Sequence, residues 1–422
     1  MNVNGRAELS IAKDLFRKLQ EIGEDGVGIT RDSYGIGESA AFDLMETEAG
    51  RHGLDTERDA AGNLVITLQS QNPERPAIAC GSHLDSVRHG GNFDGAAGVV
   101  AGFLALVRMR ADGFIPNRPL RLYALRAEES AAFGIPNLGA SALFGGVTVD
   151  QLNSLHSVSK RTLREAMREV GADVSRIERG DVLLDPSSLH AWLEVHIEQG
   201  PVLTARNLPV AVVTGIRGNV RHRRVTCLGE TGHSGAVPLN LRHDAVFAVA
   251  ELLHCLDLRS RAIIAAGDDF VFTTGILETD STNHSITRIP ETVNFSFDAR
   301  SQSIGTLDAF HSFFIAECFR LERERGVHFI IDQRIDTPPA IMDANWISRL
   351  CKALRKFGVS GEPIPSGAGH DSAIFANVGV PSGMLFIRNQ NGSHNPQEAM
   401  DLEDFMCAYQ VLHLVLTTEL KG

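Results

Sequence analysis

The sequence lacks three features that would point to a class of protein at once: a lysine- and arginine-rich run, a long hydrophobic segment and paired cysteines. A net charge of −12 without any basic run argues against a nucleic-acid surface, because phosphate binding needs clustered positive side chains. The longest apolar stretch, residues 98–107, is too short to span a bilayer. We therefore expect no nucleic-acid partner and no membrane segment.

The first residues also lack an apolar signal core and a small-residue cleavage site, so we expect a cytoplasmic protein. The six cysteines are scattered, without the spacing of a zinc or redox motif, and we expect them to be reduced and mostly packed. The composition, with 43% hydrophobic and 22% charged residues, is typical of a globular protein. A chain of 422 residues suits one large or two medium domains.

Helix and strand patterns alternate through the first part of the chain. The spacing of apolar residues predicts helices over 9–22, 40–52 and 95–108, and strands over 64–68, 77–80 and 120–125. Such alternation is typical of a mainly parallel sheet covered by helices. We therefore predict an α/β fold in which a large mixed sheet, mainly parallel, carries helices on both faces.

The middle of the chain has a different order of elements. Strands are predicted over 210–214, 223–228, 269–277 and 293–299, with helices over 244–256 and 307–323 among them. This order predicts a smaller α+β sandwich inserted into the larger domain. We place the inserted domain at residues 211–331, and the two parts of a discontinuous catalytic domain at residues 1–210 and 332–422.

Polar residues follow the predicted strands of the larger domain. His83 ends a buried strand, where the loops of an α/β sheet build their sites, and Asp85 could fix its tautomer. Asp94 precedes a helix, and its two oxygens could bridge two metal ions. The alternative interpretation of His83 is a surface histidine, and that of Asp94 is a helix N-cap. Glu128 and Glu129 are adjacent at another strand end, where two carboxylates are costly unless something neutralises them. An exposed acidic turn is the alternative there.

Two more histidines are candidates: His196 lies in a partly apolar stretch, and His394 lies in a polar loop. Either of them could have a purely structural role. Three histidines, one aspartate and one glutamate suit a pair of divalent ions, zinc first, with manganese, cobalt or nickel as alternatives. We predict a two-metal site whose ligands are His83, Asp94, Glu129, His196 and His394. Asp94 would hold the ions about 3.5–4 Å apart, and Glu128 would take the proton of a water between them.

These segments together resemble the M20-type metallohydrolases, and most closely their carbamoylase branch, which holds N-carbamoyl-L-amino-acid hydrolases, β-ureidopropionases and allantoate amidohydrolases. The matching segments run in family order between residues 81 and 398: GSHLDSV, GGNFDGAAGVV, EESAAFG, HIEQGPVL, TGHSGAVPLNLRHDA, FSFDARS, SGAGHDS and NGSHNPQE. The segment HIEQG favours the carbamoylase branch, because many peptidase relatives have an acidic ligand where His196 stands.

The resemblance implies a role for each matched ligand. His83 and His196 would each bind one end of the metal pair, and Asp94 would bridge it. Glu129 and His394 would complete the second metal. The ligands would therefore come from segments that are far apart in the sequence.

The resemblance also implies the residues that act on the substrate. Glu128 would be the general base and later the general acid, and Asp85 would orient the first histidine ligand. His233, from the inserted domain, would help to polarise the scissile carbonyl, although a merely exposed turn is the alternative. Arg300 would pair with a substrate carboxylate, unless it is a structural partner of the nearby Asp298. Further substrate contacts would come from Gln199, Thr287, Gly369 and His370.

Two positions depart from the family pattern. Thr287 stands where many relatives have asparagine, and Arg388-Asn389-Gln390 precedes the last histidine ligand where relatives often have Pro-Ser. These departures concern the substrate, not the metal ligands.

The expected activity is hydrolysis of a linear C–N bond, in a ureido or amide group, of a small substrate with a carboxylate. An N-carbamoyl-L-amino acid is the first choice, and allantoate or β-ureidopropionate is the alternative. A dipeptidase or aminoacylase on the same fold is a second alternative, and a non-catalytic binding protein a third. Because relatives pair through the inserted lid domain, the resemblance also implies a homodimer.

Overall fold

The structure, a computed structural model, describes residues 5–421 and divides into two compact units. The first unit runs up to Thr214 and resumes at Ile341, and the second comprises Gly215–Ala340. The second unit extends past the expected residue 331 because β14 (Ile335–Thr337) pairs with β7 (Gly218–Leu228). Within residues 5–421, none of the helices combines the length and the apolar character that a bilayer crossing requires. All six cysteines are unpaired.

The first unit is built on a nine-stranded sheet with the order β1-β2-β4-β3-β5-β17-β6-β15, in which β16 also pairs with β6. Its strands are β1 (Asp55–Arg58), β2 (Leu64–Leu68), β3 (Ala77–His83), β4 (Leu120–Leu125), β5 (Leu189–Ile197), β6 (Val210–Ile216), β15 (Ala340–Ile341), β16 (Ile364–Ser366) and β17 (Ser382–Ile387). A short pair, β18 (Asn389–Gln390) with β19 (Ala399–Met400), lies outside it. The predicted mixed sheet is confirmed.

Parallel pairing occurs at the centre of this sheet. Strand β3 is parallel to β4 and β5, and β5 is parallel to β17. Strands β1, β2 and β6 each pair antiparallel to a neighbour. The prediction of a mainly parallel sheet was therefore too simple, because hydrophobic patterns locate strands without giving their direction.

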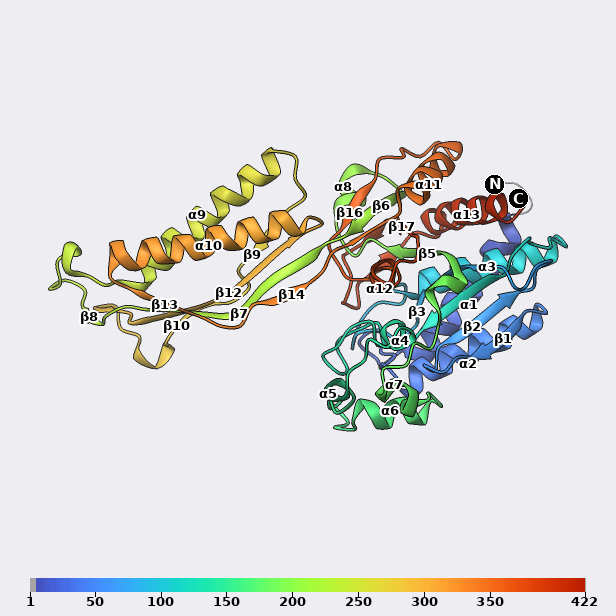
Figure 1. The fold of residues 1–422 in the computed structure, drawn as a ribbon, viewed down its shortest axis with the longest axis horizontal. Helices are drawn as coiled ribbons and strands as arrows, with labels where there is room; N and C mark the ends of the chain where they lie inside the picture. Colours follow the sequence, from blue (N-terminus) through green and yellow to red (C-terminus); the bar gives the residue numbers. More distant parts are fainter. Residues whose placement is uncertain (1–4, 422) are drawn as a thin grey trace. The chain divides into compact units, whose positions relative to one another are not determined.

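Helices cover both faces of the sheet (Figure 1). One face packs against α1 (Gly5–Gly23), α2 (Ile36–Arg51), α3 (Ala96–Ala111), α11 (Ala344–Lys356) and α13 (Leu402–Glu419). The other face packs against α4 (Leu138–Leu143), α5 (Val149–Leu152), α6 (Leu163–Glu169), α7 (Val174–Glu178) and α12 (Asp371–Asn377). Strand β4 shows the period-two alternation that separates the two cores, with Leu122 on one side and Tyr123 on the other. A short helix, α8 (Val202–Arg206), follows β5.

Helix α3 lies directly on the centre of the sheet and is buried along nearly its whole length. Gly98 makes this close packing possible, because a Cβ at that position would lie only 2.1 Å from the carbonyl oxygen of Val195. The N-terminus of α3 is thereby fixed beside the ends of β3 and β5. The residues just before α3 thus share one location with the residues that end these two strands.

The second unit is a six-stranded antiparallel sheet in the order β10-β12-β7-β13, with β9 pairing to β12 and β14 to β7. Its remaining strands are β9 (Val271–Thr273), β10 (Leu277–Thr279), β12 (Thr292–Ser301) and β13 (His328–Ile331). Helices α9 (Ala245–Ala265) and α10 (Ile304–Arg325) lie side by side and share one apolar core with the sheet (Figure 1). A separate pair joins β8 (Gly232–His233) to β11 (Arg288–Ile289).

The strand predicted over residues 269–277 is divided into β9 and β10. Between them, the backbone N–H groups of Gly275 and Ile276 donate to the side-chain oxygen of Ser296, at 3.1 and 3.0 Å, instead of to a strand backbone. The hydrophobic pattern could not show this side-chain interruption.

Candidate metal centre

The predicted ligands converge at one edge of the large sheet. His83 is the last residue of β3, His196 lies near the end of β5, and Glu129 follows β4. Asp94 stands just before α3, and His394 lies in the loop between β18 and β19. Because β3, β4 and β5 are parallel, their carboxyl ends meet at the same edge, and this brings residues from distant segments together.

Asp94 lies at the centre of two groups of possible ligands. Its Oδ1 atom is 3.1 Å from Nε2 of His196 and 3.7 Å from Nε2 of His83. Its Oδ2 atom is 3.5 Å from Nε2 of His394, which is itself 3.3 Å from Oε1 of Glu129. Each group of three offers ligand atoms that all lie within 4.8 Å of one another, and Asp94 belongs to both groups.

This grouping differs from the one that the resemblance suggested, in which His83 and His196 stood at opposite ends. Their Nε2 atoms are 3.4 Å apart, and both lie on the Oδ1 side of Asp94. The other side of Asp94 faces His394 and Glu129.

The arrangement of polar atoms fits a pair of cations. Oδ1 of Asp94 is buried and accepts no hydrogen bond from any described residue, which is a costly state for a carboxylate oxygen. Nδ1 of His83 lies 3.1 Å from the carbonyl of Asp85, and Nδ1 of His196 lies 2.9 Å from the carbonyl of Ile197. With Nδ1 carrying the proton, each Nε2 is an acceptor on the side of the centre, and that of His196 accepts from the backbone N–H of Gly95 at 3.2 Å. Such imidazole and carboxylate groups suit zinc and similar ions.

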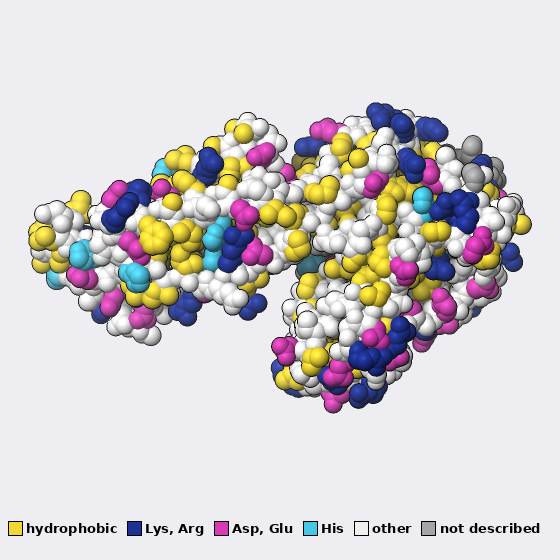
Figure 2. Space-filling view, in the orientation of Figure 1, with side chains coloured by type: hydrophobic (Ala, Val, Ile, Leu, Met, Phe, Trp, Pro, Cys, Tyr) yellow, Lys and Arg dark blue, Asp and Glu magenta, His cyan; other side chains and the backbone are white. Residues whose placement is uncertain are grey.

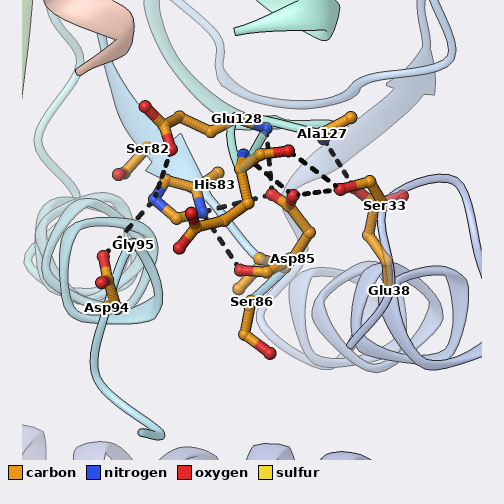
Figure 3. A network of polar contacts seen from close by, with 12 residues as sticks. Ser33, Glu38, Ser82, His83, Asp85, Ser86, Asp94, Gly95, Ala127 and Glu128 are labelled. Atoms are coloured by element: carbon orange, nitrogen blue, oxygen red, sulfur yellow. Dashed lines mark hydrogen bonds and ion pairs between the residues drawn. The ribbon is translucent and has the colours of Figure 1, made fainter. Parts of the chain in front are cut away.

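Gly95 leaves space for this centre. Its φ is 66°, and a Cβ there would lie 2.5 Å from the ring of His83. Asp94 and His83 lie within one network of polar contacts, drawn with Gly95 in Figure 3. A side chain at position 95 would therefore displace a ligand.

Asp85 joins the ends of β3 and β4. Its carboxylate accepts hydrogen bonds from the hydroxyl of Ser33, at 2.6 Å, and from the backbone N–H groups of Glu128 and Glu129, both at 3.1 Å (Figure 3). Its Oδ1 also lies 3.2 Å from Nδ1 of His83. Asp85 therefore contacts the histidine that it was expected to orient, and it also holds the backbone of both glutamates. Ser33 was not predicted, because only a contact across 52 positions identifies it.

A second buried carboxylate supports the same turn. Glu38 accepts from the backbone N–H of Ala127 and from that of Tyr34, both at 2.8 Å, and forms an ion pair with Arg126. Ala127 has a φ of 53°, a left-handed conformation that costs free energy and persists only where surrounding contacts impose it. The two glutamates after this turn lie beside different histidines, Glu128 beside His83 and Glu129 beside His394. Glu38 itself was not predicted from the sequence.

Glu128 lies beside the ligand groups. Its Oε2 atom is 3.8 Å from Nε2 of His83, and its Oε1 atom accepts a hydrogen bond of 3.0 Å from Nδ2 of Asn137. Burial raises the pKa of Glu128 well above its ordinary value. A buried carboxylate with a raised pKa, next to a candidate metal centre, is suited to carrying a proton.

Of the predicted substrate residues in the first unit, Gln199 is closest to the ligands. Its Nε2 donates to Oδ2 of Asp94 at 2.7 Å, and its backbone N–H donates to Oδ1 of Asn389 at 2.9 Å. Gly369 is exposed. His370, in contrast, is buried against His196, with ring centroids 4.4 Å apart.

In a third group, Glu194, His196 and His370, possible ligand atoms also lie within 4.8 Å of one another. Its carboxylate is already satisfied, because Glu194 accepts from the hydroxyl of Ser82 at 3.0 Å and from the N–H and hydroxyl of Ser372 at 2.8 and 2.6 Å. We interpret this group as a buried support for β5.

Three predicted residues belong to the second unit. His233 is exposed in β8, and its Nδ1 accepts from the backbone N–H of Gly235 at 3.1 Å. Thr287 is exposed just before β11. Arg300, in β12, donates to Asp298 through Nε at 3.2 Å and Nη2 at 2.9 Å, which is the structural contact named as its alternative.

The fold and the arrangement of ligands together define the class of the protein. The chain belongs to peptidase family M20/M25/M40, whose family model matches residues 79–418. It is 32% identical over 408 residues to an N-carbamoyl-L-amino acid amidohydrolase of Geobacillus stearothermophilus, covering 94% of this chain and 96% of that one. It is 29% identical to an allantoate amidohydrolase of Escherichia coli strain K12, covering 86% of each chain.

Solved structures agree with this assignment. An amidase of the hydantoinase/carbamoylase family from Burkholderia multivorans superposes with a TM-score of 0.86 at 27% identity, covering 97% of this chain and 98% of that one. The agreement extends over both units, since nearly the whole chain is covered.

Proposed function

We propose that the protein is a two-metal amidohydrolase of small ureido acids, with an N-carbamoyl-L-amino acid as its substrate. The observation that carries the proposal is the position of Asp94, whose two oxygens each face a separate group of ligands while Glu128 lies alongside. A protein that only binds its ligand has no need of such a pair of groups or of the buried Glu128. The similar proteins from Geobacillus and Escherichia act, by name, on ureido compounds, and this supports the substrate class.

The cations would be held by His83, Asp94 and His196 on one side and by Asp94, Glu129 and His394 on the other. Zinc is the first choice, with manganese, cobalt or nickel as alternatives, because these ions accept mixed nitrogen and oxygen ligands. A bound metal pair would supply Lewis-acid polarisation of the scissile carbonyl and a lowered pKa of the attacking water.

Glu128 moves the proton. Its Oε2 faces the ligand groups, so it accepts the proton of the attacking water and then donates it to the leaving nitrogen. Hydrolysis of a carbamoyl amino acid consumes one water and yields the amino acid, ammonia and carbon dioxide. Asp85 holds the His83 ring and the backbone of Glu128 in fixed positions during these steps.

The substrate residues are proposed for both units. Gln199, Gly369 and His370 would contribute from the first unit, and His233, Thr287 and Arg300 from the second, which would act as a lid. Arg300 would bind the substrate carboxylate through its forked donors. His233 would assist in polarising the carbonyl.

The distance between two of these lid residues favours a homodimer. Arg300 pairs with Asn219 at one end of β7, whereas His233 lies beyond Leu228 at the other end. Nine residues of strand span about 30 Å at 3.3 Å per residue, which is too far for one small substrate to contact both. Two copies of the second unit would be needed to supply both residues to one site.

Apolar side chains on the second unit give such a dimer a surface. Phe247 and Ile264 on α9 and Phe319 on α10 are 57%, 53% and 60% exposed, and hydrophobic side chains gather on this unit in Figure 2. Sedimentation of the wild type should give twice the mass of one chain, and Phe319→Asp should lower it. A monomeric, fully active wild type would contradict the dimer.

The substrate is tested by a parallel assay. The protein, reconstituted with zinc or manganese, should release ammonia from N-carbamoyl-L-amino acids faster than from allantoate or β-ureidopropionate, and should leave N-acetyl amino acids and dipeptides uncut. Preferred hydrolysis of dipeptides would identify a dipeptidase on the same fold. Failure with every substrate in the presence of bound metal would refute the proposed function.

A further inference from the structure

The carboxylate of Glu128 is held in a fixed direction by a side chain that has no place in the chemistry described so far. Asn137 caps the N-terminus of α4 in a left-handed conformation, with a φ of 54°. Its Nδ2 atom donates to Oε1 of Glu128 at 3.0 Å and to Oδ1 of Asp371 at 3.2 Å. One amide group therefore joins two buried carboxylates that are far apart in the sequence.

The direction of this amide follows from its neighbours. Both carboxylates approach the same terminal atom of Asn137, and only an NH₂ group can donate to two acceptors at once. If the amide were turned over, its carbonyl oxygen would face two acidic groups. The contact with Asp371 thus favours the orientation in which the NH₂ group of Asn137 faces Glu128.

The backbone of Asn137 is fixed by the same strand end. Its N–H donates to the carbonyl of Glu128 at 2.8 Å, and the next two residues, Leu138 and Gly139, donate to Ala127 and Arg126, both at 2.9 Å. Residues 137–139 are therefore hydrogen-bonded through their backbone to residues 126–128. Both the main chain and the side chain of Asn137 are attached to Glu128, so the carboxylate has little freedom to rotate.

The two oxygens of Glu128 consequently have different surroundings. Oε1 is anchored by Asn137, whereas Oε2 lies 3.8 Å from Nε2 of His83, on the side of the candidate metal centre. We propose that Asn137 and Asp371 form a positioning pair that anchors one oxygen of Glu128 and so presents the other to the reacting water. This inference rests on the proposed function of Glu128 as the proton carrier.

Asn137→Leu tests the pair, because leucine has nearly the same size and lacks the donor. We expect kcat per metal-loaded chain to fall about 10- to 100-fold with KM and metal content unchanged, since a misdirected base slows proton transfer without weakening binding. Asp371→Asn should give a smaller loss in the same direction, and it serves as the second variant if Asn137→Leu does not fold. Unchanged kcat in both folded variants would overturn the inference.

A double variant separates positioning from a general structural role. In a Glu128→Gln background, Asn137→Leu should cause no further loss of the residual rate, because the group on which Asn137 acts is already disabled. Losses that multiply would show that Asn137 only supports the fold, and would overturn the inference. If Glu128→Gln alone keeps the wild-type rate, the proposed mechanism fails instead.

A crystal structure of metal-free Asn137→Leu provides a readout independent of activity. The Glu128 carboxylate should rotate away from the position that it holds in the metal-free wild type, while Asp94 and His83 stay in place. An unmoved Glu128 would overturn the inference even if the substrate of the enzyme were never found.

Discussion

Buried charged residues surround the ligands, and each one holds a particular loop. Arg31 is fully buried, donates to the carbonyl of Leu84 at 2.7 Å and to Oδ1 of Asn92 at 3.0 Å, and has no carboxylate within ion-pair distance among residues 5–421. Burial lowers its pKa to about 10. Arg31 thus fixes both ends of the loop that connects His83 to Asp94.

Glu398 holds the same loop from the opposite end of the sequence. Its Oε1 accepts from the backbone N–H of Phe93 at 2.9 Å across 305 positions, and its Oε2 accepts from the hydroxyl of Ser393 at 2.6 Å. Such contacts depend on the complete fold, so motif reasoning could identify the ligands but not the residues that hold them. Arg388, which departs from the family pattern, forms an ion pair with Asp404 and is explained by that contact.

At the residue scale, Arg300 gives a test of carboxylate binding with a matched control. Arg300 and Arg221 both donate to Asp298, so losing either one disturbs the same contact. Arg300→Gln should raise KM for a carbamoyl amino acid about 10-fold or more, because a bidentate charged contact is lost. Arg221→Gln should leave KM within about twofold, as surface ion pairs contribute little. Equal effects of the two variants in steady-state kinetics would assign Arg300 a purely structural role.

Individual elements were predictable where apolar side chains follow a regular period. The strands at 64–68 and 120–125 agree with β2 and β4 residue for residue. Strand β1, with the polar sequence Asp-Thr-Glu-Arg, was missed because it offers no apolar alternation. His83 and Glu129 could be placed because they lie at or after predicted strands, whereas Asp94, His196 and His394 were identified from the family motifs. Asn137 was not identified, because its hydrogen bonds to residues 126–128 leave no sequence pattern.

The start of helix α3 provides a test at the element scale. Gly95→Ala should weaken metal binding, because the new Cβ would lie 2.5 Å from the ring of His83 and the residue has a φ of 66°. Gly50→Ala is the control, since that glycine lies in α2 and a Cβ there would meet no neighbouring side chain within 4 Å. Metal analysis should find two ions per chain in the control and fewer in Gly95→Ala. Full occupancy in both would contradict the assigned centre.

The two units have separate cores, so the whole molecule should unfold in two steps. One step should depend on bound metal, and the other should depend on pH. Cations that bind only the folded first unit stabilise it by mass action. Removal of the metal with a chelator should therefore lower one transition in calorimetry and leave the other unchanged. Glu129→Gln, which removes one ligand, should reduce the effect of the chelator.

The second transition should respond to acid through His311, which lies on α10. Nε2 of His311 on α10 lies 3.0 Å from Nε2 of His222 on β7, and Nδ1 of His222 lies 2.9 Å from the carbonyl of Asp332. Burial, with Arg334 and His222, lowers the pKa of His311 to about 4, while Asp308 and Asp336 oppose this.

The sign of the acid effect follows from this lowered pKa. Near neutral pH, His311 is uncharged in both the folded and the unfolded chain and contributes nothing. As the pH falls below 6.5, the ordinary pKa of histidine, His311 becomes protonated in the unfolded chain, whereas in the folded chain it becomes protonated only near pH 4. The folded state therefore loses stability between about pH 6.5 and pH 4. Calorimetry between pH 7 and 4.5 should show the chelator-insensitive transition falling, and His311→Gln should weaken that fall. An equal fall in the variant would mean that other groups cause the acid sensitivity.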